Sequence, residues 1–111
     1  MGKFVAALFL MALAPAIAIA DASDGMSQND CATRIGPMFG IMVVKFDAGP
    51  PASLIIREKY WNQIDFAQKQ EFAEIVDCAV AGEGKAIPMV YRSDMTNKPI
   101  AHWSGLRLTI D

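Results

Sequence analysis

The sequence predicts an α+β domain in which a single helix packs on a small, mostly antiparallel sheet and one disulfide ties the chain together. Three observations lead to this prediction. Apolar runs of strand length lie on both sides of one well-capped helical segment, turn residues separate these runs, and two cysteines stand far apart, at Cys31 and Cys78.

Residues 1–20 predict a cleavable signal peptide. Lys3 supplies a positive charge, residues 4–14 form an unbroken apolar run, and Ala18-Ile19-Ala20 is a small-residue cleavage site. An uncleaved membrane anchor is the weaker alternative, because Pro15 interrupts an apolar run that is already short for a bilayer. We expect a mature chain of residues 21–111 that is periplasmic or extracellular and has no stable membrane insertion after cleavage.

The charge of the mature chain is mildly acidic. Without Lys3, nine of the 10 basic residues remain against 12 acidic residues, a net charge of −3. The charges are scattered and form no basic patch, so we expect no nucleic-acid partner. No motif points to a metal or a cofactor, and we expect neither.

The two cysteines predict a disulfide. In an oxidising compartment an even pair without a CxxC motif or neighbouring histidines is typical of a structural bond, the alternative being two inert free thiols. A domain of this size has a thin core, so a Cys31–Cys78 bond is expected to stabilise it.

The first half of the mature chain predicts an arm followed by two strands. Residues 21–40 are expected to be an N-terminal arm, and residues 41–111 the α+β domain. Within that domain, residues 41–46 and 53–57 are β-branched apolar runs. A short Gly-Pro-containing turn joins them, which favours antiparallel pairing.

The best-defined element is a helix over residues 66–81. Asp65 and Gln68 have the spacing of a capping box, and Gly82 supplies the stop. Apolar residues recur at helical spacing on one face, whereas Glu71, Glu74 and Asp77 indicate an ordinary solvated face. Trp61, in a short turn before the helix, is expected to enter the core.

The last third of the chain predicts three more strands. They cover residues 87–92, 100–104 and 106–110, with a turn over residues 93–99. Period-two alternation means that either His102 or Trp103 faces outward.

The pattern over residues 53–104 resembles a group of known sequences. It comprises Trp61, a helix carrying Gln70 and ending near Cys78, then Val90-Tyr91-Arg92-Ser93-Asp94 and Lys98-Pro99-Ile100-Ala101. This pattern resembles short exported proteins of Gram-negative bacteria, which are mostly uncharacterised. The resemblance implies export and carries no activity or site residue with it.

Few residues suggest chemistry. His102, with Asp94 or Ser104, permits a hydrolase hypothesis, but the chain shows no nucleophile elbow or oxyanion loop. Tyr91, His102 and Trp103 are the better candidates, as an aromatic surface that contacts a partner. The methionines are expected to fill the core rather than to bind copper.

The preferred hypothesis is a small periplasmic binding or interaction module without enzymatic activity, whose partner is an envelope protein or a small ligand. A small envelope hydrolase using His102, or an inhibitor of an envelope hydrolase, are the alternatives. The poverty of catalytic residues favours the binding module.

Overall fold

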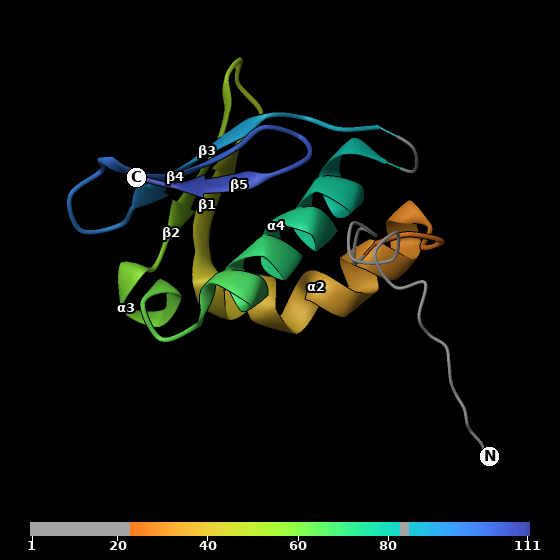
Figure 1. Cartoon of the computed structure of the whole chain (residues 1–111), viewed down its shortest axis with the longest axis horizontal. Coiled ribbons are helices and arrows are strands. Elements are labelled where there is room, and N and C mark those ends of the chain that lie inside the picture. The colour runs from red at the N-terminus through yellow and green to blue at the C-terminus, as the bar shows by residue number, and fades with distance from the viewer. Residues whose placement is uncertain (1–22, 83–84) are drawn as a thin grey trace, which may run out of the picture.

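The computed structural model describes residues 23–82 and 85–111; the predicted signal peptide lies outside them. The described elements are shown in Figure 1: α2 (Gln28–Met42), β1 (Val43–Asp47), β2 (Ala52–Ile56), α3 (Glu58–Trp61), α4 (Phe66–Ala81), β3 (Met89–Ser93), β4 (Pro99–Trp103) and β5 (Leu108–Ile110). The strands form one five-stranded sheet in the order β1-β2-β3-β4-β5. The predicted α+β class is therefore confirmed.

The prediction of a single helix is wrong, because most of the expected N-terminal arm is helix α2. The hydroxyl of Ser27 accepts from the backbone N–H of Asp30, and the Asp30 carboxylate accepts from the N–H of Ser27, which caps the helix start. Cys31, Ile35 and Met42 recur at helical spacing and are buried. The helix continues through Met42, so the first strand begins two residues later than predicted.

Helix α4 has the predicted bounds and caps. The Asp65 carboxylate accepts from the N–H of Gln68 at 2.8 Å, and the Gln68 side chain accepts from the N–H of Asp65 at 2.9 Å. Gly82 ends the helix at a φ of 96°, a backbone conformation that glycine adopts without strain.

None of the helices in residues 23–82 and 85–111 has the length and hydropathy needed to cross a bilayer.

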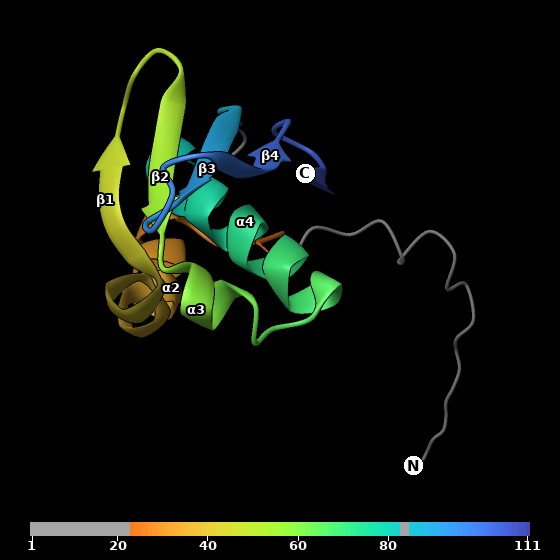
Figure 2. The same ribbon diagram turned by 90° about the vertical axis from the view of Figure 1, so that its left-hand side faces the viewer.

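The sheet is mostly antiparallel, as predicted. β1 pairs with β2, β3 with β4 and β4 with β5 in antiparallel fashion. β2 and β3 are parallel, because α3 and α4 lie between them in the chain and return it to the same end of the sheet. All three helices lie on one side of this sheet (Figures 1 and 2).

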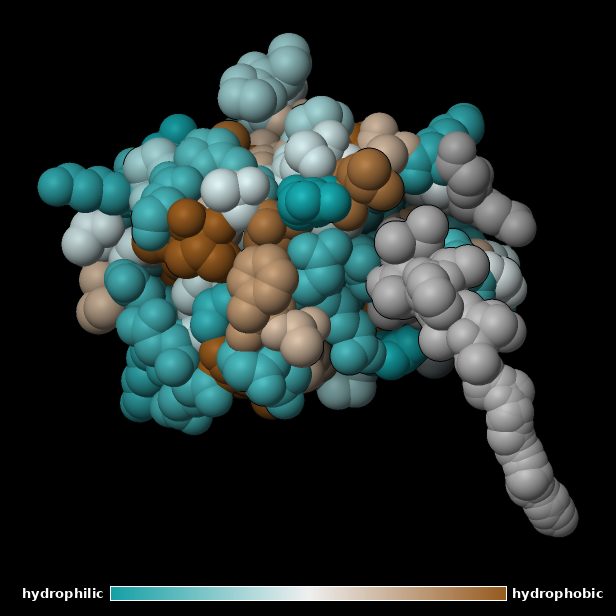
Figure 3. All heavy atoms as spheres, viewed as in Figure 1, coloured by the Kyte–Doolittle hydropathy of each residue, from teal (hydrophilic) through white to brown (hydrophobic). Residues whose placement is uncertain are grey.

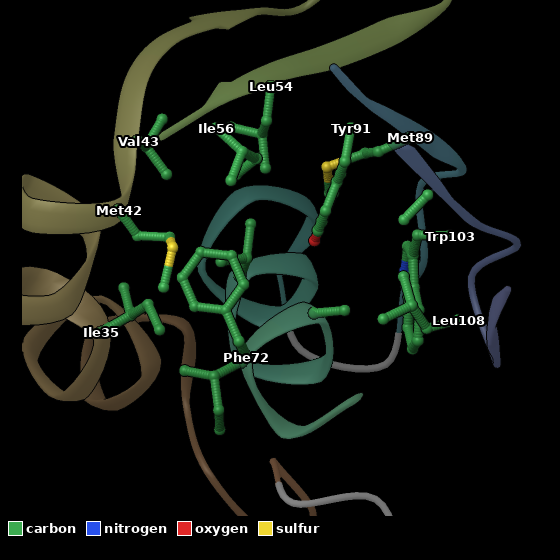
Figure 4. Packing of buried hydrophobic residues seen from close by; sticks show 14 of the residues in the cluster. Ile35, Met42, Val43, Leu54, Ile56, Phe72, Met89, Tyr91, Trp103 and Leu108 are labelled. Atoms are coloured by element: carbon green, nitrogen blue, oxygen red, sulfur yellow. The ribbon is translucent and has the colours of Figure 1, made fainter. Parts of the chain in front are cut away.

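The core lies between the sheet and α4. Figure 4 shows Tyr91 and Trp103 pointing from the sheet toward α4, and Phe72 of α4 pointing into the same core. Trp61, Phe72 and Tyr91 meet edge to face, with ring centroids 5.6 to 6.2 Å apart, so Trp61 enters the core as predicted.

The predicted disulfide joins α2 to α4. Cys31 and Cys78 are bonded, with Cα atoms 5.9 Å apart and both side chains buried. Gln28 adds a hydrogen bond from its Nε2 to the carbonyl of Ala79 at 3.0 Å. The disulfide therefore holds α2 against α4.

Candidate functional site

No helix of the described residues covers the face of the sheet opposite α2, α3 and α4. Because side chains alternate along a strand, Leu54, Tyr91 and Trp103 point to the core and their neighbours point away from it. This open face consists of Lys45, Asp47, Ser53, Ile55, Val90, Arg92, His102 and Thr109.

The strand register arranges the open face into two rows. In one row Ser53 is opposite Val90, and Val90 is opposite His102. In the other, Ile55 lies between two cations, opposite Lys45 on one side and Arg92 on the other. Each row therefore combines an apolar side chain in its middle with polar or charged neighbours.

His102 is oriented by a carboxylate. Its Nδ1 lies 2.7 Å from Oδ1 of Asp111, and the imidazole is about half exposed. With the ring proton on Nδ1, the imidazole donates this hydrogen bond to the Asp111 side chain. No hydrogen bond within the described residues involves Nε2, the other ring nitrogen of His102.

The residues suggested for a hydrolase are not arranged as a triad, although His102 and Ser104 line the same hollow. Asp94 lies beyond the far end of β3, where its Oδ1 accepts from the backbone N–H of Glu58 at 3.0 Å. The Ser104 hydroxyl donates to the carbonyl of Arg107 and accepts from two backbone N–H groups of the same turn. Asp111, the last residue, contacts His102 instead, which sequence spacing could not indicate because the contact forms across β4 and β5.

Two of the three residues expected on the partner surface are buried. Tyr91 and Trp103 are 0 % and 1 % exposed, so the expectation that they contact a partner directly is wrong. They lie on the core side because β3 and β4 both turn their larger side chains toward α4. His102 is the residue of this set that faces outward.

The buried Tyr91 has an unusual environment. Its hydroxyl and the Nε1 of Trp103 have no hydrogen-bond partner among the described residues. Burial, and secondarily the negative charge of Asp77, raise the pKa of the Tyr91 phenol far above its ordinary value. The phenol therefore stays neutral in the folded protein.

The acidic residues of α4 do not form a uniform solvated face. Glu71 pairs with Arg34 of α2 and Gln70 donates to Glu74 at 2.9 Å. Asp77 is only 6 % exposed, and its Oδ1 accepts from the backbone N–H of Ile87 at 2.8 Å. The prediction was wrong for Asp77, because the segment leading to β3 passes over it.

No metal centre can be assigned. In the described part of the chain, no group of three or more His, Cys, Asp or Glu side chains is placed to hold a metal ion. Met42 and Met89 are buried as expected, whereas Met38 and Met95 are exposed.

Two shallow hollows lie along the open face. One, of about 490 Å³, is lined by Lys45, Asp47, Ser53, Ile55, Arg92, Ser93, Asp94 and Asn97. The other, of about 170 Å³, includes Val90, His102 and Thr109. Ser53 lines the first hollow and its strand partner Val90 lines the second, so the two hollows lie on neighbouring parts of the open face.

A third hollow, between α2 and α4, is less suited to recognition. It measures about 170 Å³ and is largely apolar, with Arg34 and Glu71 at its rim. These two side chains neutralise each other and Gln68 is engaged in the helix cap, so few polar groups are left to orient a ligand. Figure 3 shows the apolar side chains over the helices in small patches separated by polar ones.

Comparison of the chain with protein-family models, with curated protein sequences and with solved structures gives no significant match.

Proposed function

We propose that this chain is an exported binding module without enzymatic activity that recognises an envelope protein through the open face of its sheet. The observation that carries the proposal is that, within residues 23–82 and 85–111, the helices cover only one face of the five-stranded sheet. On the other face, apolar Ile55 and Val90 are partly exposed and lie beside His102 and Arg92.

The shape of this face favours a protein over a small molecule. Sites for small ligands are concave and enclose most of the ligand surface. Both hollows on the open face are shallow and open along the sheet, so a small molecule there would keep much of its surface in water. A broad surface with apolar residues at its centre and charged ones around them is typical of protein interfaces.

The charges suggest the chemistry of the partner. Lys45 and Arg92 flank Ile55 on an otherwise acidic chain, and the His102 ring presents Nε2. A partner surface with an apolar centre and acidic residues near the two cations would complement this row. An envelope hydrolase inhibited by this chain is one such partner.

A hydrolase remains the second candidate, because Asp111 orients His102 as a carboxylate orients a catalytic base. Ser104 is engaged in its turn, so this base would have to activate a water molecule. Loss of turnover of an envelope substrate in a folded His102→Ala variant would favour the hydrolase and overturn the binding proposal.

Site-specific photo-crosslinking in producing cells tests the binding proposal. A photoreactive side chain is introduced at Val90 or Thr109 on the open face, and at Thr33 or Gln63 on the helical side as matched controls. We expect the same crosslinked protein from both open-face positions and not from the controls. Absence of any crosslink from Val90 and Thr109, or a product confined to the helical side, would refute the proposal.

A quantitative test then uses the captured protein in purified form. His102→Ala is expected to weaken its binding at least tenfold, whereas Gln63→Ala leaves the affinity unchanged. Equal affinities of the two variants and the parent chain would show that the open face is not the binding surface.

A further inference from the structure

We propose that two copies of this chain associate through the free edge of β1, which joins their sheets across a two-fold axis. This inference goes beyond the proposed function, because it concerns a second copy of this chain at the edge of the sheet and does not depend on an envelope partner.

The two edge strands of the sheet, β5 and β1, differ in whether their outer backbone groups have hydrogen-bond partners. At the β5 edge, Gln70 of α4 accepts from the backbone N–H of Leu108 at 3.0 Å and lies 3.5 Å from the carbonyl of Leu106. The outer side of β1 pairs with no element of the described chain, and Figure 2 shows β1 as the outermost strand. An uncovered strand edge presents backbone donors and acceptors that another strand can satisfy.

The charges along β1 are complementary to themselves. Lys45 and Asp47 lie on the same face of the strand, since their partners on β2 are Ile55 and Ser53, and Phe46 lies between them on the other face. An antiparallel two-fold pairing centred on Phe46 places Lys45 opposite Asp47 of the second copy, twice. Opposite charges in directly facing positions stabilise a strand pair.

The charges of β1 differ from those that guard an edge against self-association, although the strand also carries an irregularity between Val43 and Lys45. A guarded edge carries charges, often lysines, that meet like charges when two copies approach. Lys45 and Asp47 stand at equal distances from Phe46, so self-pairing joins unlike charges. In the same register Phe46 faces Phe46 of the second copy, and their partly exposed rings add an apolar contact.

Apolar surface is concentrated where α2 runs into β1. Ile41, near the end of α2, and Val44, near the start of β1, are 55 % and 50 % exposed. Val44 lies in the irregularity of β1 between Val43 and Lys45, next to the residues that pair in the proposed register. Burial of this surface would supplement the strand pairing, because apolar area removed from water stabilises an interface.

The oligomeric state of the exported, oxidised protein tests the proposal, measured by sedimentation velocity over a range of concentrations. We expect a reversible dimer. Lys45→Asp and Asp47→Lys each place like charges opposite one another, and each is expected to raise the dimer dissociation constant at least tenfold. Lys98→Asp, at an exposed position in the β3–β4 turn, is the matched control and leaves it unchanged.

A charge-swapped double variant and a mixture of the two single variants complete the test. The double variant Lys45→Asp/Asp47→Lys restores unlike charges at both contacts and is expected to dimerise like the parent chain. An equimolar mixture of the two single variants does the same in trans, so a heterodimer is expected from chains that are each monomeric. This mixture also shows that both single variants remain folded.

A chain that is monomeric at every concentration would overturn the proposal, including one whose β1 edge pairs with a different protein. A dimer unaffected by the single variants, or a double variant as impaired as either single one, would overturn it as well.

Discussion

Breaking the Cys31–Cys78 bond is expected to lower the free energy of unfolding by about 4 kcal/mol. The bond closes a loop between residues 47 positions apart. On the chain-entropy model, a loop of this length removes about 14 cal/mol/K from the unfolded ensemble, which is about 4 kcal/mol at 25 °C. Small domains have total stabilities of only about 5–15 kcal/mol, so the loss is severe.

The other polar contacts between α2 and α4 cannot replace the bond. Arg34 and Glu71 are both about half exposed, and such an ion pair contributes about 0–1 kcal/mol. The hydrogen bond from Gln28 to the carbonyl of Ala79 is also exposed. Helix α2 moreover contains Pro37, which removes one intrahelical hydrogen bond.

Urea unfolding of the oxidised and the reduced parent chain measures the effect without changing any other side chain. A Cys31→Ala/Cys78→Ala variant serves as a second reference that cannot reoxidise. Hydrogen exchange should show the largest loss of protection in α2. A difference below about 1 kcal/mol between the oxidised and reduced chains would refute the loop-entropy reasoning.

Three further predictions concern buried or partly buried polar groups. Gln70→Ala removes the acceptor of the Leu108 N–H and is expected to cost about 1–2 kcal/mol in urea unfolding, against a negligible effect of the exposed control Gln63→Ala. Asp77→Ala leaves the N–H of Ile87 without this acceptor and is expected to cost about 1–3 kcal/mol. Asp77→Asn retains an acceptor oxygen and should cost less, so equal losses would contradict this reasoning. In the unfolded chain the Tyr91 phenol ionises above its ordinary pKa of 10.0, whereas in the folded chain it stays protonated. The free energy of unfolding is therefore unaffected by this group below pH 10 and falls as the pH rises past 10. Between pH 10 and 11 the loss approaches about 1.4 kcal/mol per pH unit, and it should be absent in Tyr91→Phe; parallel pH curves for the two chains would refute the assignment.

The part of the fold that the sequence predicts best is the part with local signals. Asp65 and Gln68 cap α4 within a single turn, and Gly82 ends it, so no distant contact is needed to place this helix. Helix α2 was not predicted, although Ser27 and Asp30 form a similar box, because the residues before Cys31 are polar and include a glycine, and Gly36-Pro37 and Gly40 are typical of a hinge or a turn. Packing on α4 and the disulfide compensate for the lost hydrogen bond.

The candidate site was predictable only in outline. Alternation along β4 indicates that His102 and Trp103 face opposite sides, yet it does not say which side is the core. That choice depends on α4, which covers the face carrying Trp103. The contact of His102 with Asp111 depends on the pairing of β4 with β5, a relation between separate segments.

The sequence by itself determined the caps of α4, the alternating strands and the disulfide partners, because capping and alternation follow from neighbouring residues and two cysteines allow one pairing. Only the tertiary structure decided that α2 forms and that Asp77 and Tyr91 are buried. It also decided that the described elements leave one face of the sheet and the edge of β1 uncovered. These features depend on which surfaces remain after the helices have packed, and packing joins residues that are far apart in the chain.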